Sequence, residues 1–183
     1  MSRLPVINPD DMSEDQKRVA AEITAGPRGE VRGPFLPLMH NPGAADAVQR
    51  MGAFLRFGGT LPGRLRELAI LLTGRDWTAQ YEWFAHYKIA LNEGLDAAVA
   101  DAIAERKRPD FKNKDEEIVY NFVTELLQAR RVGEPAFEAA RELLGNAGVV
   151  ELVVVCGHYS VVSMVLNAFD VRVPTGETPL SED

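Results

Sequence analysis

Two carboxylates and one imidazole occur at helical spacing within an otherwise apolar stretch of the chain. Glu82 and His86 are four residues apart, so on a helix they would share one face about one turn from each other. Glu67 stands in the apolar run that precedes them. Because charged side chains are seldom buried without a partner or a function, these three residues are the first candidates for a site.

An imidazole beside a carboxylate suits general acid–base chemistry. An unperturbed histidine has a pKa near ~6.5, and a carboxylate one turn away can raise that pKa or fix the tautomer. We therefore expect His86 to transfer a proton, with Glu82 as the favoured residue that orients its ring and Glu67 as the alternative. Two structural interpretations compete with this one. His86 could be a hydrogen-bonded core histidine, and Glu67 could form an ion pair with Arg64 or Arg66.

Several side chains close to this cluster are candidates for substrate binding. Arg75, Arg66 and Arg56 could each hold a substrate carboxylate through a bidentate guanidinium contact. Tyr81 could donate a hydrogen bond, and His40 could fold over a pocket from its loop. A solvated surface position is the competing interpretation for each of them.

The sequence indicates no metal or cofactor. Glu82 and His86 would supply two metal ligands, but no third ligand stands at a useful spacing, and no glycine-rich phosphate loop is present. The formal charge of -7 argues against sequence-independent binding of nucleic acid, which needs a basic face. A small anionic substrate is still compatible with this charge, because a few local arginines can override the global balance.

Length and composition fit one globular domain in the cytoplasm. The 183 residues, 46% of them hydrophobic, can bury a sizeable core. A lone cysteine, Cys156, excludes an internal disulfide and is expected to be a small buried apolar side chain. The N-terminus lacks the apolar core of a secretory signal, so we expect a cytoplasmic protein. Residues 149–169 approach the length of a membrane span but contain polar residues, which favours a buried helix.

Helix start and stop signals recur along the chain and predict an all-α fold. Ser13 and Gln16 predict a capping box before the first helix, and Asn41-Pro42 predicts the start of a second helix that ends near Phe57. Residues 147–168 are rich in valine, but a strand of that length would be unusual, which favours a helix. The other helices are expected at 62–76 with a break at 74–76, at 76–92 with Asp76 or Thr78 as the cap, and at 96–107, 115–130 and 135–144.

We divide the single domain, residues 1–183, into four segments. These are an N-terminal helix with an irregular, surface-lying arm (1–40), a first helical half carrying the candidate site (41–110), a second helical half (115–172) and a tail (173–183). The tail is expected to be an arm or a frayed end. Arg66-Glu67-Leu-Ala-Ile-Leu resembles Val150-Glu151-Leu-Val-Val-Val, which suggests two related halves. Glu151 and His158 would share a helix face and could form a second buried polar pair.

The spacing of Glu67, Ala79, Glu82 and His86 resembles the signature of the carboxymuconolactone decarboxylase and alkylhydroperoxidase D (AhpD) superfamily. Its redox branch carries Glu, Cys-x-x-Cys and His at these offsets. The resemblance covers most of residues 34–172 and implies an all-helical AhpD-like fold with an internally repeated helical motif, assembled as a homo-oligomer, a trimer or a hexamer. It places Glu67 and His86 at the family's site positions. Other matching stretches are Gly33-Pro34-Phe35, His40-Asn41-Pro42, Gly59-Thr60-Leu61 and Leu166-Asn167-Ala168-Phe169.

Ala79 and Glu82 stand where the redox branch has its two cysteines, which argues against thiol chemistry because the disulfide needs a resolving thiol. The resemblance therefore implies a cofactor-free, decarboxylase-type lyase that acts on a small carboxylated lactone or ring acid. His86 would be the acid, and Arg75 or Arg66 the substrate anchor. Two alternatives stay open, an alkylhydroperoxidase-like peroxidase and a non-catalytic helical oligomer that binds a small molecule. The non-catalytic alternative predicts a fully satisfied polar cluster without an accessible cavity.

Overall fold

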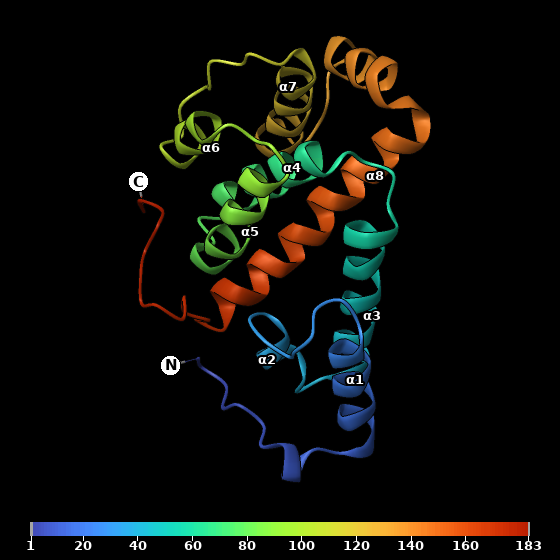
Figure 1. Cartoon of the computed structure of the whole chain (residues 1–183), viewed down its shortest axis with the longest axis vertical. Coiled ribbons are helices and arrows are strands. Elements are labelled where there is room, and N and C mark those ends of the chain that lie inside the picture. Colours follow the sequence, from blue (N-terminus) through green and yellow to red (C-terminus); the bar gives the residue numbers. More distant parts are fainter. Residues whose placement is uncertain (1, 183) are drawn as a thin grey trace.

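The computed structural model describes residues 2–182, and over that range the secondary structure is entirely helical (Figure 1). A short 3-10 turn, Pro9–Asp11, precedes the first helix, and a π-helical turn, Phe54–Gly58, continues the third. The all-α prediction is confirmed. The helices are α1 (Glu14–Ala25), α2 (Phe35–Leu38), α3 (Pro42–Ala53), α4 (Gly63–Asp76), α5 (Gln80–Asn92), α6 (Ala97–Ala104), α7 (Lys114–Ala129) and α8 (Glu134–Ala168).

Local capping chemistry sets several helix starts, as the sequence predicts. The Ser13 hydroxyl accepts from the Gln16 backbone N–H at 3.3 Å, and the Gln16 side chain accepts from the Ser13 N–H at 2.8 Å, which completes the capping box. The Asn41 side chain accepts from the Ala44 N–H at 3.1 Å at the start of α3. These caps satisfy backbone donors that the first turn of a helix leaves without partners.

The junction between α4 and α5 differs from the prediction. Neither Asp76 nor Thr78 caps α5, whose N-cap residue is Ala79, without a side-chain cap. Helix α4 also continues through the expected break at 74–76, and the turn is closed instead by backbone bonds, including one of 2.8 Å from the Ala79 N–H to the Gly74 carbonyl. The turn is short, so α5 folds directly back along α4.

Helix α4 is the centre of the fold. It packs against α5, α6, α7 and α8, and nearly every side chain from residue 67 to residue 75 is buried. In Figure 1, α8 crosses the middle of the molecule, with α4 and α5 on one side and α3 on the other. A helix that is apolar around most of its circumference needs neighbours on all sides, and α4 has them.

The N-terminal arm is less irregular and less superficial than expected. Residues 34–39 form the short helix α2 with its flanks, and this segment turns apolar side chains inward. They make a second, smaller core with α1 and α3, because the amphipathic faces of these helices need an apolar partner. The buried members of this core are Val19, Ile23, Phe35, Met39 and Ala45.

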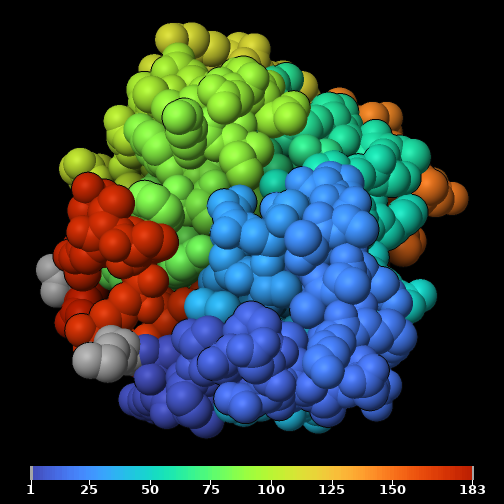
Figure 2. All heavy atoms as spheres, turned by 60° about the horizontal axis from the view of Figure 1, so that its bottom comes forward, coloured from blue at the N-terminus to red at the C-terminus, as the bar shows by residue number. Residues whose placement is uncertain are grey.

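The arm and the tail both lie against the main helices. At Gly33 an added Cβ would lie 2.6 Å from Cε1 of Tyr81, so only glycine allows the arm to approach α5 so closely. The tail is docked rather than frayed at Leu180, whose backbone N–H and carbonyl both bond to the Gln80 side chain, at 2.9 and 2.8 Å. Figure 2 shows the N-terminal segment and the tail side by side on one face of the molecule.

Helix α8 is two helices joined at a kink. Gly145 has φ 68° and ψ 172°, a conformation outside the helical region, so the predicted stop at this glycine agrees with the structure. The helix is long and apolar enough by composition to cross a membrane, yet 56% of its most apolar window is buried within the molecule. Burial against other helices thus accounts for much of its apolar sequence.

Some apolar side chains of α3, the π-turn and α8 remain exposed. They include Met51, Phe54, Phe57, Val150 and Met164, each at least 46% exposed. Self-association as a trimer or hexamer stays a prediction.

We predict that Gly145→Ala destabilises the protein through the backbone alone. Nothing lies within 4 Å of the position that an added Cβ would take, so the substitution causes no clash, but φ 68° with ψ 172° is a region that only glycine visits readily. The expected loss in the free energy of unfolding is about 1–3 kcal/mol by urea denaturation. Gly157→Ala, in a helical stretch with open space around it, is the matched control and should not destabilise. Equal stability of the wild type and Gly145→Ala would contradict the prediction.

Candidate functional site

The His86 imidazole is fixed by a buried hydrogen bond between α4 and α5. Nδ1 of His86 lies 2.6 Å from Oε2 of Glu67, and both side chains are buried. Oε1 of Glu67 accepts from Nε of Arg66 at 3.3 Å. Glu67 is therefore the carboxylate that is hydrogen-bonded to the ring, whereas the sequence favoured Glu82 as the partner, with Glu67 as the alternative.

Glu67 is held as a carboxylate despite its burial. Burial acts to raise the pKa of Glu67, but the hydrogen bond and charge of His86, helped by Arg66 and Arg56, bring that pKa below its ordinary value. An ionised Glu67 can only accept, so Nδ1 of His86 carries the proton and donates it. Nε2 is then the ring nitrogen left to exchange a proton with another group.

Glu82 lies on the other side of the ring and has the opposite electrostatic character. Its Oε1 is 3.1 Å from Nε2 of His86, but this charge contact lacks hydrogen-bond geometry, and Oε1 is buried with no hydrogen-bond partner. Burial raises the pKa of Glu82, against the lowering influence of the His86 charge. The carboxyl group is thus biased toward its protonated form, which can donate a proton.

Glu82 and His86 line a cavity of about 580 Å³. This volume falls within the range of about 300–1,000 Å³ typical of small-molecule sites. Glu67 lies behind His86 and does not line the cavity. The walls combine apolar and aromatic side chains with cationic ones, and they include Arg28, Phe35, Arg56, Tyr81, Phe84, Ile89, His158, Tyr159 and Val162.

Helix α8 adds a second imidazole to the cavity. The Tyr159 ring meets both His86 and His158 edge to face, with centroids 5.0 Å apart in each pair. Burial lowers the pKa of His158 to about 4, with Arg28 and His86 adding to the effect, so His158 is neutral at pH 7. Burial also raises the pKa of Tyr159, which keeps its hydroxyl protonated. The cavity therefore places neutral groups next to the Glu67–His86 pair.

The structure brings some of the other candidates to the cavity and leaves others outside. Tyr81 and Arg56 line it, whereas Arg66 is bonded to Glu67 behind the imidazole. His40 is exposed and contacts the Pro5 carbonyl through Nε2 at 2.9 Å. It does not reach the cavity.

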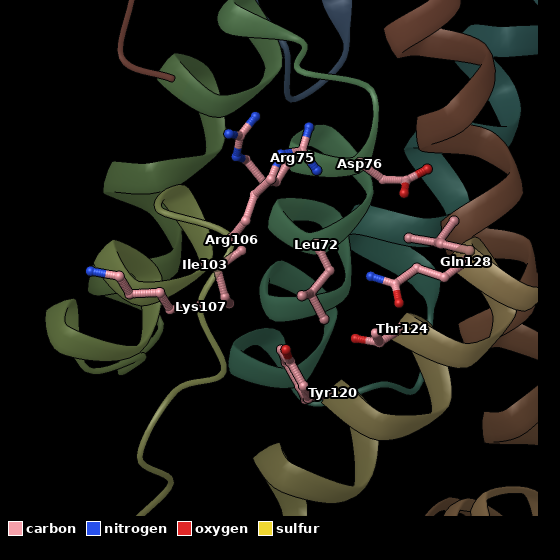
Figure 3. Close-up of a pocket in the computed structure, with 10 residues that line it drawn as sticks. Leu72, Arg75, Asp76, Ile103, Arg106, Lys107, Tyr120, Thr124 and Gln128 are labelled. Atoms are coloured by element: carbon pink, nitrogen blue, oxygen red, sulfur yellow. The ribbon is translucent and has the colours of Figure 1, made fainter. Parts of the chain in front are cut away.

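Arg75 lies in a different part of the molecule. Its Nη1 donates to Thr78 at 3.0 Å and its Nη2 to Ser181 in the tail at 3.1 Å. It lines a separate cleft of about 110 Å³ together with Asp76 and Arg106 (Figure 3). Eight residues beyond Glu67 on the same helix, Arg75 lies about 12 Å farther along the helix axis and lines a different cavity, so it is not placed to anchor a substrate at His86.

The expected pair of Glu151 and His158 does not form. Glu151 turns instead to the start of α4, where it accepts from the Thr60 backbone N–H at 2.8 Å and from the Leu61 N–H at 3.2 Å. His158 faces the cavity. The two side chains lie on one helix but contact different parts of the molecule, which helical spacing alone cannot predict.

Sequence reasoning missed Arg28 and the roles of His158 and Tyr159 in lining the cavity. Arg28 belongs to the glycine- and proline-rich connection after α1, where no periodicity indicates which side chains turn inward. His158 and Tyr159 carry a clearer signal, since they are polar residues within the apolar run of α8.

Two features bear on thiol and metal chemistry. Burial raises the pKa of Cys156 to about 12, so its thiolate form is strongly disfavoured. Within residues 2–182, no group of three or more His, Cys, Asp or Glu side chains is arranged to hold a metal ion.

Removing Glu67 should destabilise the protein strongly. Glu67→Ala leaves the buried Nδ1–H of His86 without an acceptor, and the expected loss in the free energy of unfolding is about 1–3 kcal/mol. Glu67→Gln keeps an acceptor oxygen and should lose clearly less. Glu105→Gln, which removes an exposed ion pair with Lys107, should change stability by no more than about 0.5 kcal/mol. Urea denaturation measures all three, and a Glu67→Ala variant as stable as the wild type would rule out the pairing described here.

Replacing Glu82 by glutamine should stabilise the protein in a pH-dependent way. Because burial raises the pKa of Glu82 above its ordinary 4.5, folding favours the protonated form. This contribution is present below the unfolded pKa and is lost as the pH rises through the folded pKa. Glu82→Gln should therefore raise Tm more at pH 8 than at pH 4.5, each kcal/mol appearing as about 2–4 °C in a thermal melt. A gain that is equal at both pH values would show that Glu82 ionises as it does in the unfolded chain.

Comparison with known proteins identifies solved structures that share the fold of this chain. No protein-family model and no curated protein matches the chain significantly. Among solved structures, the AhpD core of an uncharacterised peroxidase-related protein from Ralstonia eutropha JMP134 has a TM-score of 0.77 at 22% identity, covering 93% of this chain and 91% of that one. An uncharacterised peroxidase-related protein from Silicibacter sp. TM1040 has a TM-score of 0.72 at 14% identity, covering 92% and 88%.

A third solved structure is that of an Agrobacterium tumefaciens protein of unknown function, provisionally described as an AhpD antioxidant defence protein. It has a TM-score of 0.67 at 18% identity, covering 78% of this chain and 99% of that one. All three identities are low, so the likeness concerns the arrangement of the helices. The chain has the AhpD-like helical fold.

Proposed function

We propose that this protein is an acid–base enzyme of the decarboxylase type, acting on a small carboxylated lactone or related ring acid. The observation that carries the proposal is the placement of His86 and Glu82 on a cavity of about 580 Å³, with the imidazole tautomer fixed from behind by Glu67. Proton transfer by a positioned imidazole contributes about 10²–10⁴-fold to rate. The three side chains thus provide a proton donor, a proton acceptor and an orienting group.

The proposed reaction exchanges a carboxylate for a proton. The bond between the ring carbon and the departing carboxylate breaks, carbon dioxide leaves, and the electron pair is delocalised onto the lactone carbonyl. The carboxyl proton of Glu82 is then delivered to carbon, directly or through Nε2 of His86, and solvent replaces it. The overall change consumes one carboxylate and one proton and gives one carbon dioxide and one C–H bond. No oxidant or reductant is needed.

A non-catalytic binding protein fits the site less well. That alternative predicts a closed, fully satisfied polar cluster, whereas His86 lines an open cavity and Oε1 of Glu82 is buried without a hydrogen-bond partner. A buried oxygen without a hydrogen-bond partner lowers the stability of the folded protein, so such atoms are few and often have a function. Proton transfer to a bound substrate would be such a function. This observation supports the enzyme over the passive binder.

The peroxidase alternative draws its support from the peroxidase-related descriptions of two structural neighbours. The residues of this chain favour it less. Ala79 and Glu82 occupy the positions at which the redox branch carries its cysteines, and the thiol of Cys156 is buried with its pKa raised to about 12. A peroxidase cycle through a disulfide would also need a second thiol in the chain.

The test is turnover of γ-carboxymuconolactone, followed by ultraviolet absorbance and by carbon dioxide release in D2O. We expect the wild type to release carbon dioxide and to place one solvent deuteron on the product. His86→Gln and Glu82→Gln should each lower kcat by about 10²–10⁴-fold, because each removes one partner of the proton transfer. Glu105→Gln, an exposed carboxylate outside the cavity, should leave kcat unchanged.

Two results would contradict the proposal. One is a wild type that leaves this lactone and related ring acids intact. The other is reduction of cumene hydroperoxide by the wild type that persists in Cys156→Ser, since it would show peroxidase chemistry without the thiol.

A further inference from the structure

Two guanidinium groups face the cavity without a carboxylate partner. Arg28, from the connection after α1, and Arg56, from the π-turn after α3, both line it. Neither forms an ion pair with any carboxylate of residues 2–182. By contrast, Arg64 is paired with Asp115 at 2.7 Å. The cavity lining also holds Lys88, the ion pair of Arg32 with Glu30, and the carboxyl group of Glu82. In a chain with a net charge of -7, cationic side chains therefore outnumber carboxyl groups next to the candidate catalytic residues.

Arg28 is held in place but is not satisfied. Its guanidinium carbon lies 4.9 Å from the centroid of the Phe35 ring, a stacking contact that fixes the plane of the group. Its Nε is buried and has no hydrogen-bond partner. Burial lowers the pKa of Arg28, and the positive charge of Arg56 adds to this effect, whereas the charges of Tyr159 and Glu82 oppose it, so the two cations are close enough to repel each other. The buried donor without a partner and the two cations that line the same cavity together favour the binding of an anion.

The backbone of α3 leaves room for this arrangement. An added Cβ at Gly52 would lie 2.4 Å from Nη2 of Arg28 and 2.8 Å from Nε2 of His158. Glycine at this position therefore lets Arg28 and His158 reach the same part of the cavity wall. A neutral imidazole next to the guanidinium supplies a further hydrogen-bonding group without adding charge.

We propose that Arg28 and Arg56 form a carboxylate-binding subsite of this cavity. The subsite would hold the carboxylate that a ring acid retains while Glu82 and His86 act on the rest of the molecule. The action of Glu82 and His86 on the ring rests on the proposed function, whereas the binding of a carboxylate by the two arginines does not. The planar guanidinium fork matches a carboxylate in a bidentate contact, and Phe35, Ile89 and Val162 give the ring an apolar wall.

Calorimetric titration with 5-oxotetrahydrofuran-2-carboxylate, a stable lactone acid, tests the subsite. Its neutral carboxamide is the paired ligand, and inorganic phosphate is the competing anion. We expect the wild type to bind the carboxylate at least tenfold more tightly than the amide, and more tightly than phosphate. Arg28→Gln and Arg56→Gln should each weaken carboxylate binding by roughly tenfold or more, because each removes a charge-assisted hydrogen bond. Neither variant should change amide binding.

Arg50→Gln is the matched control. It removes the same charge from α3, but Arg50 is 64% exposed and already paired with Asp46. Its affinity for the lactone acid should stay within about twofold of the wild type, since exposed paired charges contribute little.

Thermal melts of the ligand-free proteins separate loss of binding from loss of folding. Because Nε of Arg28 is buried without a hydrogen-bond partner and the charge of Arg56 opposes that of Arg28, the ligand-free Arg28→Gln variant should melt at the same temperature as the wild type or higher while it binds the acid less well. A structural role for Arg28 predicts the opposite, a lower melting temperature. Arg28→Lys keeps the charge but loses the fork, and it should recover only part of the affinity.

The outcomes are distinct. Undiminished carboxylate binding by both Arg28→Gln and Arg56→Gln overturns the subsite, and so does equal wild-type affinity for acid and amide or tighter binding of phosphate. Arginine-dependent binding of the acid by a protein that decarboxylates no lactone supports the subsite while removing the proposed reaction. Decarboxylation at the wild-type rate by both variants supports the proposed reaction while removing the subsite.

Discussion

The hydrogen bond between Glu67 and His86 is the interaction on which the site depends. Glu67 is completely buried in α4, at 0% exposure, so its charge requires a partner within the protein. That partner comes from α5, which the short turn after Asp76 folds directly back along α4. The same bond that compensates the buried carboxylate also fixes the ring orientation and the tautomer of His86. The compensation of a buried charge and the geometry of the candidate site share one contact, so a change of either residue affects both.

The two carboxyl groups next to the His86 imidazole have pKa values that their surroundings shift in opposite directions. Both are buried, but Glu67 receives hydrogen bonds from His86 and Arg66, whereas Oε1 of Glu82 receives none. The pKa of Glu67 is consequently lowered and that of Glu82 raised. Paired titratable groups whose pKa values are pushed apart are a common basis for assigning acid and base roles. In this chain the difference arises from hydrogen-bond partners, since burial alone would shift both carboxyl groups in the same direction.

The predictable parts of the molecule are those set by local chemistry. The capping box at Ser13, the start of α3 at Asn41 and the stop at Gly145 depend on neighbouring residues, and the sequence predicts them. The proximity of Glu82 to His86 is likewise local, being a single helical turn. Pairing Glu67 with His86 crosses two helices, and the family resemblance was needed to link them. Arg28, Arg75 and the docked tail could not be placed, because their positions depend on tertiary contacts with no sequence periodicity.

The candidate site residues come from two parts of the fold, the main core and the N-terminal arm, and this origin affects how substrate choice could change. Helices α4, α5 and α8 supply Glu67, Glu82, His86 and His158 from the main core, whereas Arg28 arrives on the connection after α1. That connection is anchored by a separate small core, which includes Phe35 and Met39. The arm contacts Tyr81 of α5 and meets His158 at the cavity wall, but α4 packs mainly against α5, α6, α7 and α8. Residues of the arm can therefore vary with little effect on the packing of α4. If the arm selects the anion while the core holds the proton, a change of ligand would require substitutions around Arg28 and none around His86.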